Sequence, residues 1–559
     1  MKNFAVTVLD TTGIQPYVFG SNRLRENIGA SYLVSQVTDN WVREALNKLK
    51  TDIKQDVYAF DPKNHQPEAK PHIENHGLAA ELIYAGGGNT VLLFSDKQYA
   101  VQFTRILSKR ILEEAPGINL VVVHKEFDWD SKSLSLYEVI QDVMKNELDV
   151  KKRSRIPSAP LLGLGVTATC RSTQLVAVGM SEKFEDDEPY LISREIKAKH
   201  KVISRANNKL QEMFATSLGS YEFPLRTDKI GRSEGDSSYV AVVHADGNGM
   251  GKRFQNFGEN LPNREYIIAM RKLSHSVNQA GIKALKTVIE ILVTSIKPDE
   301  NGKKKVKGQF EIKDNYLPFR PLVYGGDDVT FVCDGRLGLE LAAIYLEKLE
   351  EQIIADGKPI KACAGICVVK THYPFARAYQ LSEDLCRKAK VFVKDEKKEN
   401  GKEDFSALDW HLAASGLSGS ISEIRQREYQ VPTGNLTMRP VSLKKERDSD
   451  WRTWQGFTKV VKQLNEHEDW KGRRNKVIAL REVLRQGIDA TQKFLKNYRI
   501  KDEQLPLFPK FSGQSTDLAK KGWLNGICGY FDAIEAMEFY IDLKEETNGK
   551  ISIENQTAE

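Results

Sequence analysis

Hydrophobic and polar positions follow the same order in two separate regions of the chain, which indicates an internal repeat. In the first region, a strand-like alternation at 4–10 leads through a glycine turn into a helical pattern from 23 to 49. In the second, a strand-like alternation at 239–246 leads through closely spaced glycines into a helical pattern from 264 to 292. Because side chains alternate along a strand and recur about every 3.6 residues along a helix, each region predicts a strand followed by a crossover helix.

Each region continues with a glycine turn between two short apolar runs, a pattern typical of a β-hairpin. The first turn is Tyr84-Ala-Gly-Gly-Gly-Asn89 and the second is Val323-Tyr-Gly-Gly-Asp-Asp328. A further helical pattern and a further strand-like run follow each turn, at 97–114 and 119–123 in the first region and at 337–354 and 360–369 in the second. Both regions therefore predict βαββαβ units, in which an antiparallel sheet carries helices on one face.

The repeat predicts the organisation of the 559-residue chain. Residues 1–155 are expected to form a first palm-like domain and 237–400 a second, joined by a connecting element at 156–236. Beyond residue 400 the strand patterns fade and apolar residues recur at helical spacing, so 401–559 is expected to form a C-terminal helical domain. The predicted fold class is α+β, with two ferredoxin-like palm or nucleotidyl-cyclase domains plus the C-terminal helical domain.

Composition excludes several classes of protein. Apolar residues are 40% of the chain and charged residues 28%, which argues against wholesale disorder and against fibrous proteins. No apolar run is long enough to span a membrane, and the N-terminus lacks the pattern of a secretory signal. The six cysteines are scattered without CxxC spacing, so we expect reduced thiols in a cytoplasmic protein without a membrane partner. A net charge of +6 over this length indicates no partner by itself.

Three aspartates supply the candidate chemistry. Asp246 ends the first strand of the second unit, and Asp327 and Asp328 lie at the tip of its hairpin. In a palm-type sheet this strand and hairpin are neighbours, so the three carboxylates are expected to converge at one end of the sheet. Carboxylates are preferred ligands of Mg²⁺ and Mn²⁺, and two such ions activate an attacking hydroxyl and neutralise a leaving pyrophosphate. We therefore predict that all three are catalytic metal ligands in a nucleoside triphosphate site.

Further residues are expected to contact the nucleotide, either through bare backbone or through positive charge. They are Gly247, Asn248, Gly249, Gly251, Lys252, Gly325, Gly326, Lys388 and Lys390. The hairpin glycines permit a tight turn with positive φ, and the loop at 247–251 offers backbone amides close to a helix N-terminus. The two lysines lie on a helix that could fold back over the sheet, where they would meet phosphate.

Each of these features also has a simpler explanation. A Gly-Gly-Asp-Asp turn is common with solvated acids, Asp246 could cap a helix, and the lysines could merely solvate a helix face. The combination inside a repeat, with the expected order of elements, favours the metal site. The first copy has Gly88 and Asn89 where the second has Asp327 and Asp328, although Asp10 is kept. We therefore expect a catalytic half paired with a degenerate half that can still shape a nucleotide pocket.

At these residues the sequence resembles the large polymerase/cyclase subunit of type III CRISPR effector complexes. The match covers roughly residues 1–400, and the shared stretches lie at 10–15, 27–33, 85–89, 244–252 and 320–328, in the Ala-Gly-Ile run with Tyr373-Pro374, and at Ala389-Lys390. The resemblance implies a two-metal transfer in which ATP is joined 3′ to 5′ and cyclised into oligoadenylate messengers for antiviral defence. It also implies guide or target RNA and other CRISPR effector subunits as partners, and a fold similar to GGDEF-type and class III cyclases.

Two departures from that family are expected to matter. None of the ten histidines is followed by aspartate, which predicts a variant without the HD nuclease domain. Only Cys170 lies between the palms, so we expect no structural zinc there. Basic clusters that could meet an RNA backbone, or merely lie in solvated loops, occur at 151–155, 197–201, 303–307 and 471–476. Two alternatives stay open: an RNA-binding scaffold with vestigial catalysis, and a stand-alone cyclic mono- or dinucleotide cyclase.

Overall fold

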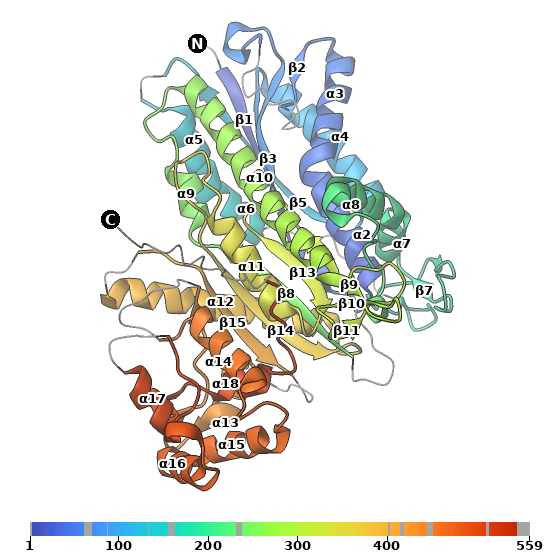
Figure 1. Ribbon diagram of the computed structural model, residues 1–559. Helices are drawn as coiled ribbons and strands as arrows, with labels where there is room; N and C mark the ends of the chain where they lie inside the picture. The colour runs from blue at the N-terminus through green and yellow to red at the C-terminus, as the bar shows by residue number, and fades with distance from the viewer. Residues whose placement is uncertain are drawn as a thin grey trace, which may run out of the picture.

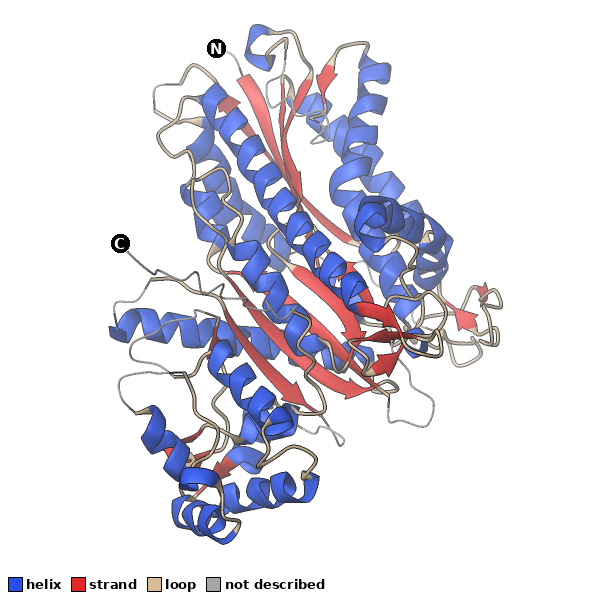
Figure 2. Cartoon of the chain, in the orientation of Figure 1, coloured by secondary structure: helices blue, strands red, loops and turns tan. Residues whose placement is uncertain are grey.

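The computed structural model describes residues 3–60, 70–86, 88–131, 133–154, 163–230, 238–400, 403–413, 419–443, 451–509 and 514–544. Within these residues the chain forms two mixed layers of sheet and helix, with a mainly helical C-terminal region beside the second (Figures 1 and 2). The predicted α+β class with two ferredoxin-like units is confirmed. Every helix in the described part of the chain is too short or too polar to span a bilayer.

The first unit contains β1 (Asn3–Thr12), α1 (Ile14–Phe19), α2 (Leu24–Ser35), the π-helical η1 (Gln36–Asn40), α3 (Trp41–Ile53), β2 (Val57–Tyr58), β3 (Ala80–Gly86), β4 (Asn89–Phe94), α4 (Lys97–Glu114) and β5 (Asn119–Asp128). Its strand order is β2-β3-β4-β1-β5, and β1 runs antiparallel to both neighbours. The first strand is therefore an inner strand, between β4 and β5, and its end is flanked by the β3–β4 turn. After β5 the chain forms α5 (Leu136–Asp142), η4 (Val143–Glu147) and α6 (Leu148–Ser154).

The second unit repeats this order with β8 (Tyr239–Gly247), α9 (Met250–Asn256), α10 (Asn263–Ser295), β12 (Phe319–Val323), β13 (Val329–Asp334), α11 (Gly338–Glu350), β14 (Ala362–Lys370) and α12 (Phe375–Asn400). Between α10 and β12 lies a small sheet of β9 (Ile296–Pro298), β10 (Lys304–Val306) and β11 (Phe310–Glu311). The main sheet has the order β12-β13-β8-β14, so β8 takes the central place that β1 has in the first sheet.

The second sheet continues beyond residue 400, where strand patterns fade in the sequence. β15 (Ala407–Leu412) pairs in parallel with β14, and β18 (Val441–Ser442) pairs with β15. β15 is short and buried on both faces, including the polar Asp409 and His411, so its sequence lacks the alternation that marks a half-exposed strand. The division expected at residue 400 thus falls between two strands of one sheet.

The C-terminal region combines helices with a small four-stranded sheet. Its helices are α13 (Ile421–Tyr429), α14 (Trp454–Glu466), α15 (Arg474–Gln486), α16 (Ile488–Asn497), α17 (Ser515–Lys521) and α18 (Phe531–Ala536), and its sheet has the order β16 (Gln430–Val431), β17 (Gly434–Asn435), β20 (Ile527–Cys528), β19 (Trp523–Leu524). Trp410 of β15 packs against Trp454 and Phe457 of α14, with ring centroids 6.4 and 4.7 Å apart. The region therefore shares its apolar core with the second sheet.

One buried carboxylate of the first unit helps to hold the connecting element in place. It contains β6 (Gly179–Met180), β7 (Leu191–Ile192), α7 (Arg194–Lys201) and α8 (Ile203–Leu218). Glu26 of α2 accepts hydrogen bonds from Ser21, Ser172 and Tyr190 at 2.5, 3.0 and 2.6 Å. Burial opposes ionisation, but these bonds and the His200 ring lower the pKa of Glu26 to about 2. The carboxylate is therefore charged at neutral pH and fully used in holding the element.

The two units cover each other's sheets. Tyr266, Ile267 and Met270 of α10 lie in one apolar cluster with Val6 and Val91 of the first sheet. In return, Ser31 of α2 donates to the carbonyl oxygen of Leu322 on β12, and apolar side chains of α2 share a cluster with β8. Figure 1 shows α10 running from beside the first sheet to beside β13 and β8 of the second. Because each unit packs a helix against the sheet of the other, the glycine turns of both sheets come to lie at the interface between the units.

Candidate active site between the two palm-like units

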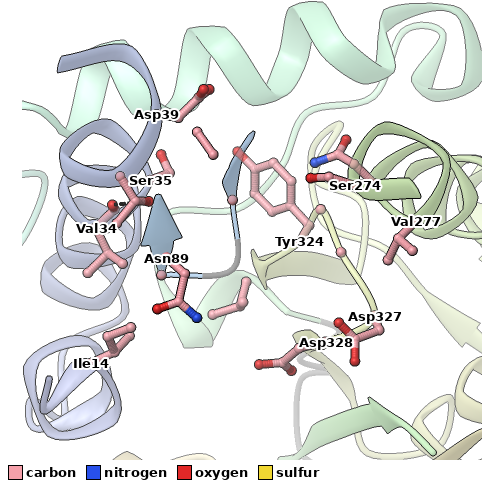
Figure 3. Close-up of a pocket in the computed structure, with 18 of the residues that line it drawn as sticks. Ile14, Val34, Ser35, Asp39, Asn89, Ser274, Val277, Tyr324, Asp327 and Asp328 are labelled. Carbon is pink, nitrogen blue, oxygen red and sulfur yellow. Dashed lines mark hydrogen bonds between the residues drawn. The ribbon is translucent and has the colours of Figure 1, made fainter. Parts of the chain in front are cut away.

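A cavity of about 1070 Å³ lies at this interface and is lined from both units. The first unit contributes α2, η1 and the β3–β4 turn, and the second contributes β8, the β12–β13 turn, α10 and α12. The connecting element adds α8. In Figure 3, Asp327 and Asp328 lie on one side of the cavity, while Ser35 and Asn89 of the first unit lie on the other. The volume is at the upper end of the range for small-molecule sites and suits a ligand as large as a nucleotide.

The cavity contains all three aspartates of the second unit. Pairing of Ala245 with Val329 continues the register so that Asp246 lies across from Asp328. Asp327 lies close to the bare backbone of Gly247, where an added Cβ would come within 2.9 Å of the Asp327 Cβ. The turn that carries Asp327 and Asp328 depends on Gly325 and Gly326, whose φ angles are 96° and 124°. Residues with a Cβ rarely adopt such angles, so the glycines determine the direction in which the acids point.

Both hairpin aspartates are poorly solvated and repel other acids. Burial and the nearby charge of Asp246 raise the pKa of Asp327 to about 6 and that of Asp328 to about 7. The side chain of Asp328 is 50% exposed, but its Oδ1 atom is buried and accepts no hydrogen bond. A buried carboxylate oxygen without a donor, beside two further acids, is the environment in which a cation would be most favourable.

His244 supports this group from the same strand. It lies two residues before Asp246, so both side chains emerge on the same face of β8. Its Nδ1 is 3.2 Å from the Thr330 hydroxyl and 3.4 Å from Asp328 Oδ1. Burial lowers the pKa of His244 even though Asp246 is close, so the ring is uncharged at neutral pH. We made no assignment for this histidine from the sequence, although its two-residue spacing from Asp246 was a usable signal.

Lys390 of α12 binds Asp246 directly. Its Nζ lies 2.5 Å from Asp246 Oδ2 and 3.1 Å from the carbonyl oxygen of Gly247. Burial lowers the pKa of Lys390, but the carboxylate outweighs it and raises the pKa above the usual value. Glu383 and Arg387 also line the cavity. These two and Lys390 are spaced as i, i+4 and i+7 on one helix face, a pattern that could have identified Glu383 and Arg387 from the sequence.

Several residues expected at the nucleotide lie elsewhere. Lys388 donates to the Ser422 hydroxyl at 2.9 Å, because a position two residues from Lys390 lies on another side of the helix. The side-chain amide of Asn248 donates to Asp404 and to the Phe405 carbonyl oxygen, and its backbone N–H donates to the Lys361 carbonyl oxygen at 2.7 Å. This backbone N–H is therefore not available to bind phosphate.

Of the remaining predicted residues, three glycines and four charged residues line the cavity. They are Gly251, Gly325, Gly326, Asp246, Asp327, Asp328 and Lys390. Gly247 is buried beneath Asp327, while Gly249 and Lys252 are exposed outside the cavity lining. Gly249 begins α9 with a φ of 64°, and this helix is only seven residues long.

The first unit shows how the same scaffold appears without the paired acids. Asp10 of β1 pairs in register with Asn89 of β4, at the positions that Asp246 and Asp328 have in the second unit. The Asn89 amide, oriented with its nitrogen towards Asp10, donates to both carboxylate oxygens at 2.8 and 3.1 Å. Lys152 of α6 forms an ion pair with the same carboxylate. Asp10 is thus fully satisfied by protein groups.

The arrangement of the acids differs from a preformed metal centre. Among the described residues, no three His, Cys, Asp or Glu side chains are grouped so as to hold a metal ion. One oxygen of Asp246 is already bound by Lys390. The donor chemistry nevertheless fits a hard divalent cation, because three carboxylates line the cavity and Asp328 Oδ1 has no donor.

The basic clusters at 151–155, 197–201 and 303–307 are partly used within the molecule. Lys152 binds Asp10, and Lys199 is buried with its Nζ donating to Glu195 and to the Tyr17 carbonyl oxygen. Lys305 of the small sheet pairs with Asp299 at 2.8 Å. These lysines stabilise local structure and are weaker candidates for RNA contact than their sequence suggested.

The second unit matches a known protein family. The family model described as "Cas10/Cmr2, second palm domain" matches residues 239–402. No curated protein matches the chain.

Solved structures of Csm1 are similar to the chain at low identity. Csm1 in T. onnurineus is 14% identical, with a TM-score of 0.46 over 96% of this chain and 70% of that chain. The Csm1–Csm4 cassette in complex with pppApA is 10% identical, with a TM-score of 0.48 over 96% and 69%. The cassette in complex with cA4 is 11% identical, with a TM-score of 0.47 over 96% and 69%.

The matched segment runs from β8 to the end of α12, with two residues beyond. It holds Asp246, the glycine turn with Asp327 and Asp328, and the helix of Lys390. Residues 239–402 are therefore similar to the second palm domain of Cas10/Cmr2 proteins.

Proposed function

We propose that this protein is a metal-dependent nucleotidyltransferase that converts ATP into cyclic oligoadenylate-type messengers. The observation that carries the proposal is the cavity between the palms, in which Asp246, Asp327 and Asp328 of a Cas10/Cmr2 second palm domain lie together. In this proposal the chain acts in the cytoplasm as a CRISPR effector subunit in antiviral defence. Its partners are nucleoside triphosphate, guide or target RNA and other effector subunits.

The three aspartates would hold Mg²⁺ or Mn²⁺, which fits the buried acceptor Asp328 Oδ1 and the raised pKa values of both hairpin acids. When bound, two such ions supply charge neutralisation for the attacking hydroxyl and the leaving pyrophosphate. Asp246 would have to exchange its bond with Lys390 to take part. His244 lies against Asp328, with its Nδ1 3.4 Å from Oδ1, and because the ring is uncharged at neutral pH it adds no positive charge that would oppose a divalent ion.

The remaining groups of the cavity bind and orient substrate. Arg387 and Lys390 place two positive charges on one helix face beside the aspartates, where triphosphate oxygens would bind. The bare backbone of Gly326, where an added Cβ would meet nothing within 4 Å, leaves room for the nucleotide next to the acids. The opposite wall, from α2 to Asn89, provides a surface for a second nucleotide.

The decisive experiment is to incubate the purified protein with Mg²⁺ or Mn²⁺ and each labelled nucleoside triphosphate, with and without RNA. We expect cyclic oligonucleotides from ATP, identified by mass spectrometry. A cyclic mono- or dinucleotide made without RNA would instead support a stand-alone cyclase. Absence of product from all four triphosphates under every condition would refute the enzymatic proposal and favour the scaffold role.

Gly281→Ala is expected to slow product formation by roughly a hundredfold without unfolding the protein. Gly281 lies in the middle of α10, and an added Cβ would come 2.4 Å from the carbonyl oxygen of Gly326, which cannot move independently of the aspartate turn. Alanine favours helix by about 1 kcal/mol over glycine, so α10 itself should not melt. Initial rates and thermal melting measure the two effects.

Lys283→Ala, at an exposed position of the same helix, is the matched control and should keep the wild-type rate. A Gly281→Ala protein with the wild-type rate would show that the position of the Gly326 backbone does not matter for the reaction.

A further inference from the structure

Each palm pairs the aspartate at the end of its central strand with a lysine from a helix that follows its last main strand. In the second palm the pair is Asp246 with Lys390 of α12, and in the first it is Asp10 with Lys152 of α6. The two helices follow β14 and β5, which are equivalent strands of the repeat. The same electrostatic arrangement therefore occurs twice, at equivalent places in the two sheets.

The surroundings of the two pairs differ in one respect. Around Asp10, the Asn89 amide donates to both carboxylate oxygens, and Lys152 forms an ion pair with the same carboxylate. Around Asp246, the position of Asn89 is taken by Asp328, and Asp327 lies next to it. Lys390 thus binds one of three neighbouring aspartates, while Lys152 binds an aspartate that Asn89 also satisfies.

We propose that Lys390 is a resident cation that holds the place of a divalent ion at Asp246 and leaves it for phosphate when nucleotide arrives. This inference rests on the proposed nucleotide site. A divalent ion that arrived alone would compete with the ammonium for Asp246 Oδ2 and would be repelled by it over a few ångströms. A triphosphate that arrives with the ion offers Lys390 another anion, which removes both obstacles.

The position of Lys390 permits this exchange. Its side chain lines the cavity and is about one-third exposed, and its flexible four-carbon stem can swing without moving α12. Arg387 lies one turn earlier on the same helix and lines the cavity beside it, so phosphate would meet two cations. Binding of the divalent ion and binding of nucleotide are therefore coupled, and each should strengthen the other to the same degree.

The test is the affinity of the full chain for Mn²⁺, measured from the electron paramagnetic resonance signal of free Mn²⁺. The wild type, Lys390→Met, Lys390→Arg and Lys152→Met are compared without nucleotide and with a non-hydrolysable ATP analogue. Without nucleotide, Lys390→Met should bind Mn²⁺ about tenfold more tightly than the wild type, because the competing charge is gone. Lys390→Arg keeps the charge and should stay near the wild type, as should Lys152→Met.

With the ATP analogue the order should reverse. The wild type should gain Mn²⁺ affinity, whereas Lys390→Met should gain little because it has lost a phosphate ligand. Equal Mn²⁺ affinity of the wild type and Lys390→Met without nucleotide would overturn the proposal, and so would a tightening of Lys390→Arg as large as that of Lys390→Met. Thermal melting of the free proteins shows whether each variant is folded.

Mn²⁺ binding is read independently of product formation, so the two proposals can fail separately. A wild-type protein that makes cyclic oligonucleotides, with no effect of Lys390→Met on Mn²⁺ binding, would overturn the role of Lys390 alone. The crossed pattern of affinities in a protein that makes no product would support Lys390 as the resident cation and refute the proposed reaction.

Discussion

The double change Asp327→Asn, Asp328→Asn is expected to reduce cyclic oligonucleotide formation by on the order of a thousandfold or more. Asparagine keeps the shape of the hairpin but removes two of the three negative charges that would hold divalent ions. Asp246 alone would remain, and Lys390 already neutralises it. The measurement is the initial rate of product formation from ATP at saturating Mg²⁺ or Mn²⁺.

The same change should not destabilise the protein. Burial and the charge of Asp246 raise the pKa of Asp327 to about 6 and that of Asp328 to about 7, so their ionised forms are disfavoured in the folded state. Neutral asparagines remove this cost, and the melting temperature should stay equal or rise.

A suitable control is Asp502→Asn, Glu503→Gln, an adjacent acidic pair that is exposed outside the cavity and should leave the rate unchanged. Full activity of the asparagine double variant would contradict the site assignment, whereas loss of activity with a large fall in melting temperature would show a folding defect instead.

Arg271→Met is expected to destabilise the protein by about 3 to 5 kcal/mol, the usual cost of removing one partner from a buried ion pair. Arg271 of α10 and Glu81 of β3 have fully buried side chains, 2.8 Å apart, and join the two palms. Arg271 also donates to the Leu82 carbonyl oxygen, and Arg264 binds Glu81 at 2.6 Å. Without Arg271, the Glu81 carboxylate would remain buried with a single cationic partner. Urea unfolding followed by tryptophan fluorescence measures the loss.

Lys272→Ala, the exposed neighbour on the same helix, should change stability by less than about 0.5 kcal/mol. The double change Arg271→Met, Glu81→Leu should recover part of the lost stability, because it also removes the buried Glu81 carboxylate. The recovery should be only partial, because Arg264 already neutralises part of that charge in the single variant. If Arg271→Met unfolded at the wild-type urea concentration, the ion pair would contribute nothing to the joining of the palms.

The elements around the aspartates were predictable from local sequence. The alternation at 239–246 and the two glycines before Asp327 specify a strand and a tight turn within a few residues of each acid. The repeat then supplied the strand order, because a βαββαβ unit places its first strand beside its hairpin. The α+β class is confirmed, while the catalytic role of Asp246, Asp327 and Asp328 stays a prediction.

Side-chain direction on helices and loops was harder to predict. Lys388 and Lys390 are equivalent as charges in a sequence, but a helix turns by about 100° per residue, and only Lys390 faces the cavity. Asn248 was expected at the nucleotide because of its neighbours, yet it bonds to Asp404 and Phe405, more than 150 residues away in the chain. Such long-range partners leave no local pattern.

Local sequence thus determined the two palm units and the positions of the three aspartates within the second. Strands, helices and glycine turns are specified by patterns that span only a few neighbouring residues. The tertiary structure determined that the cavity is shared between the palms, that Lys390 rather than Lys388 binds Asp246, and that Lys152 and Asn89 satisfy Asp10. These contacts depend on how α2, α6, α10 and α12 pack against the sheets. Packing of that kind results from burial summed over the whole interface, which no short stretch of sequence encodes.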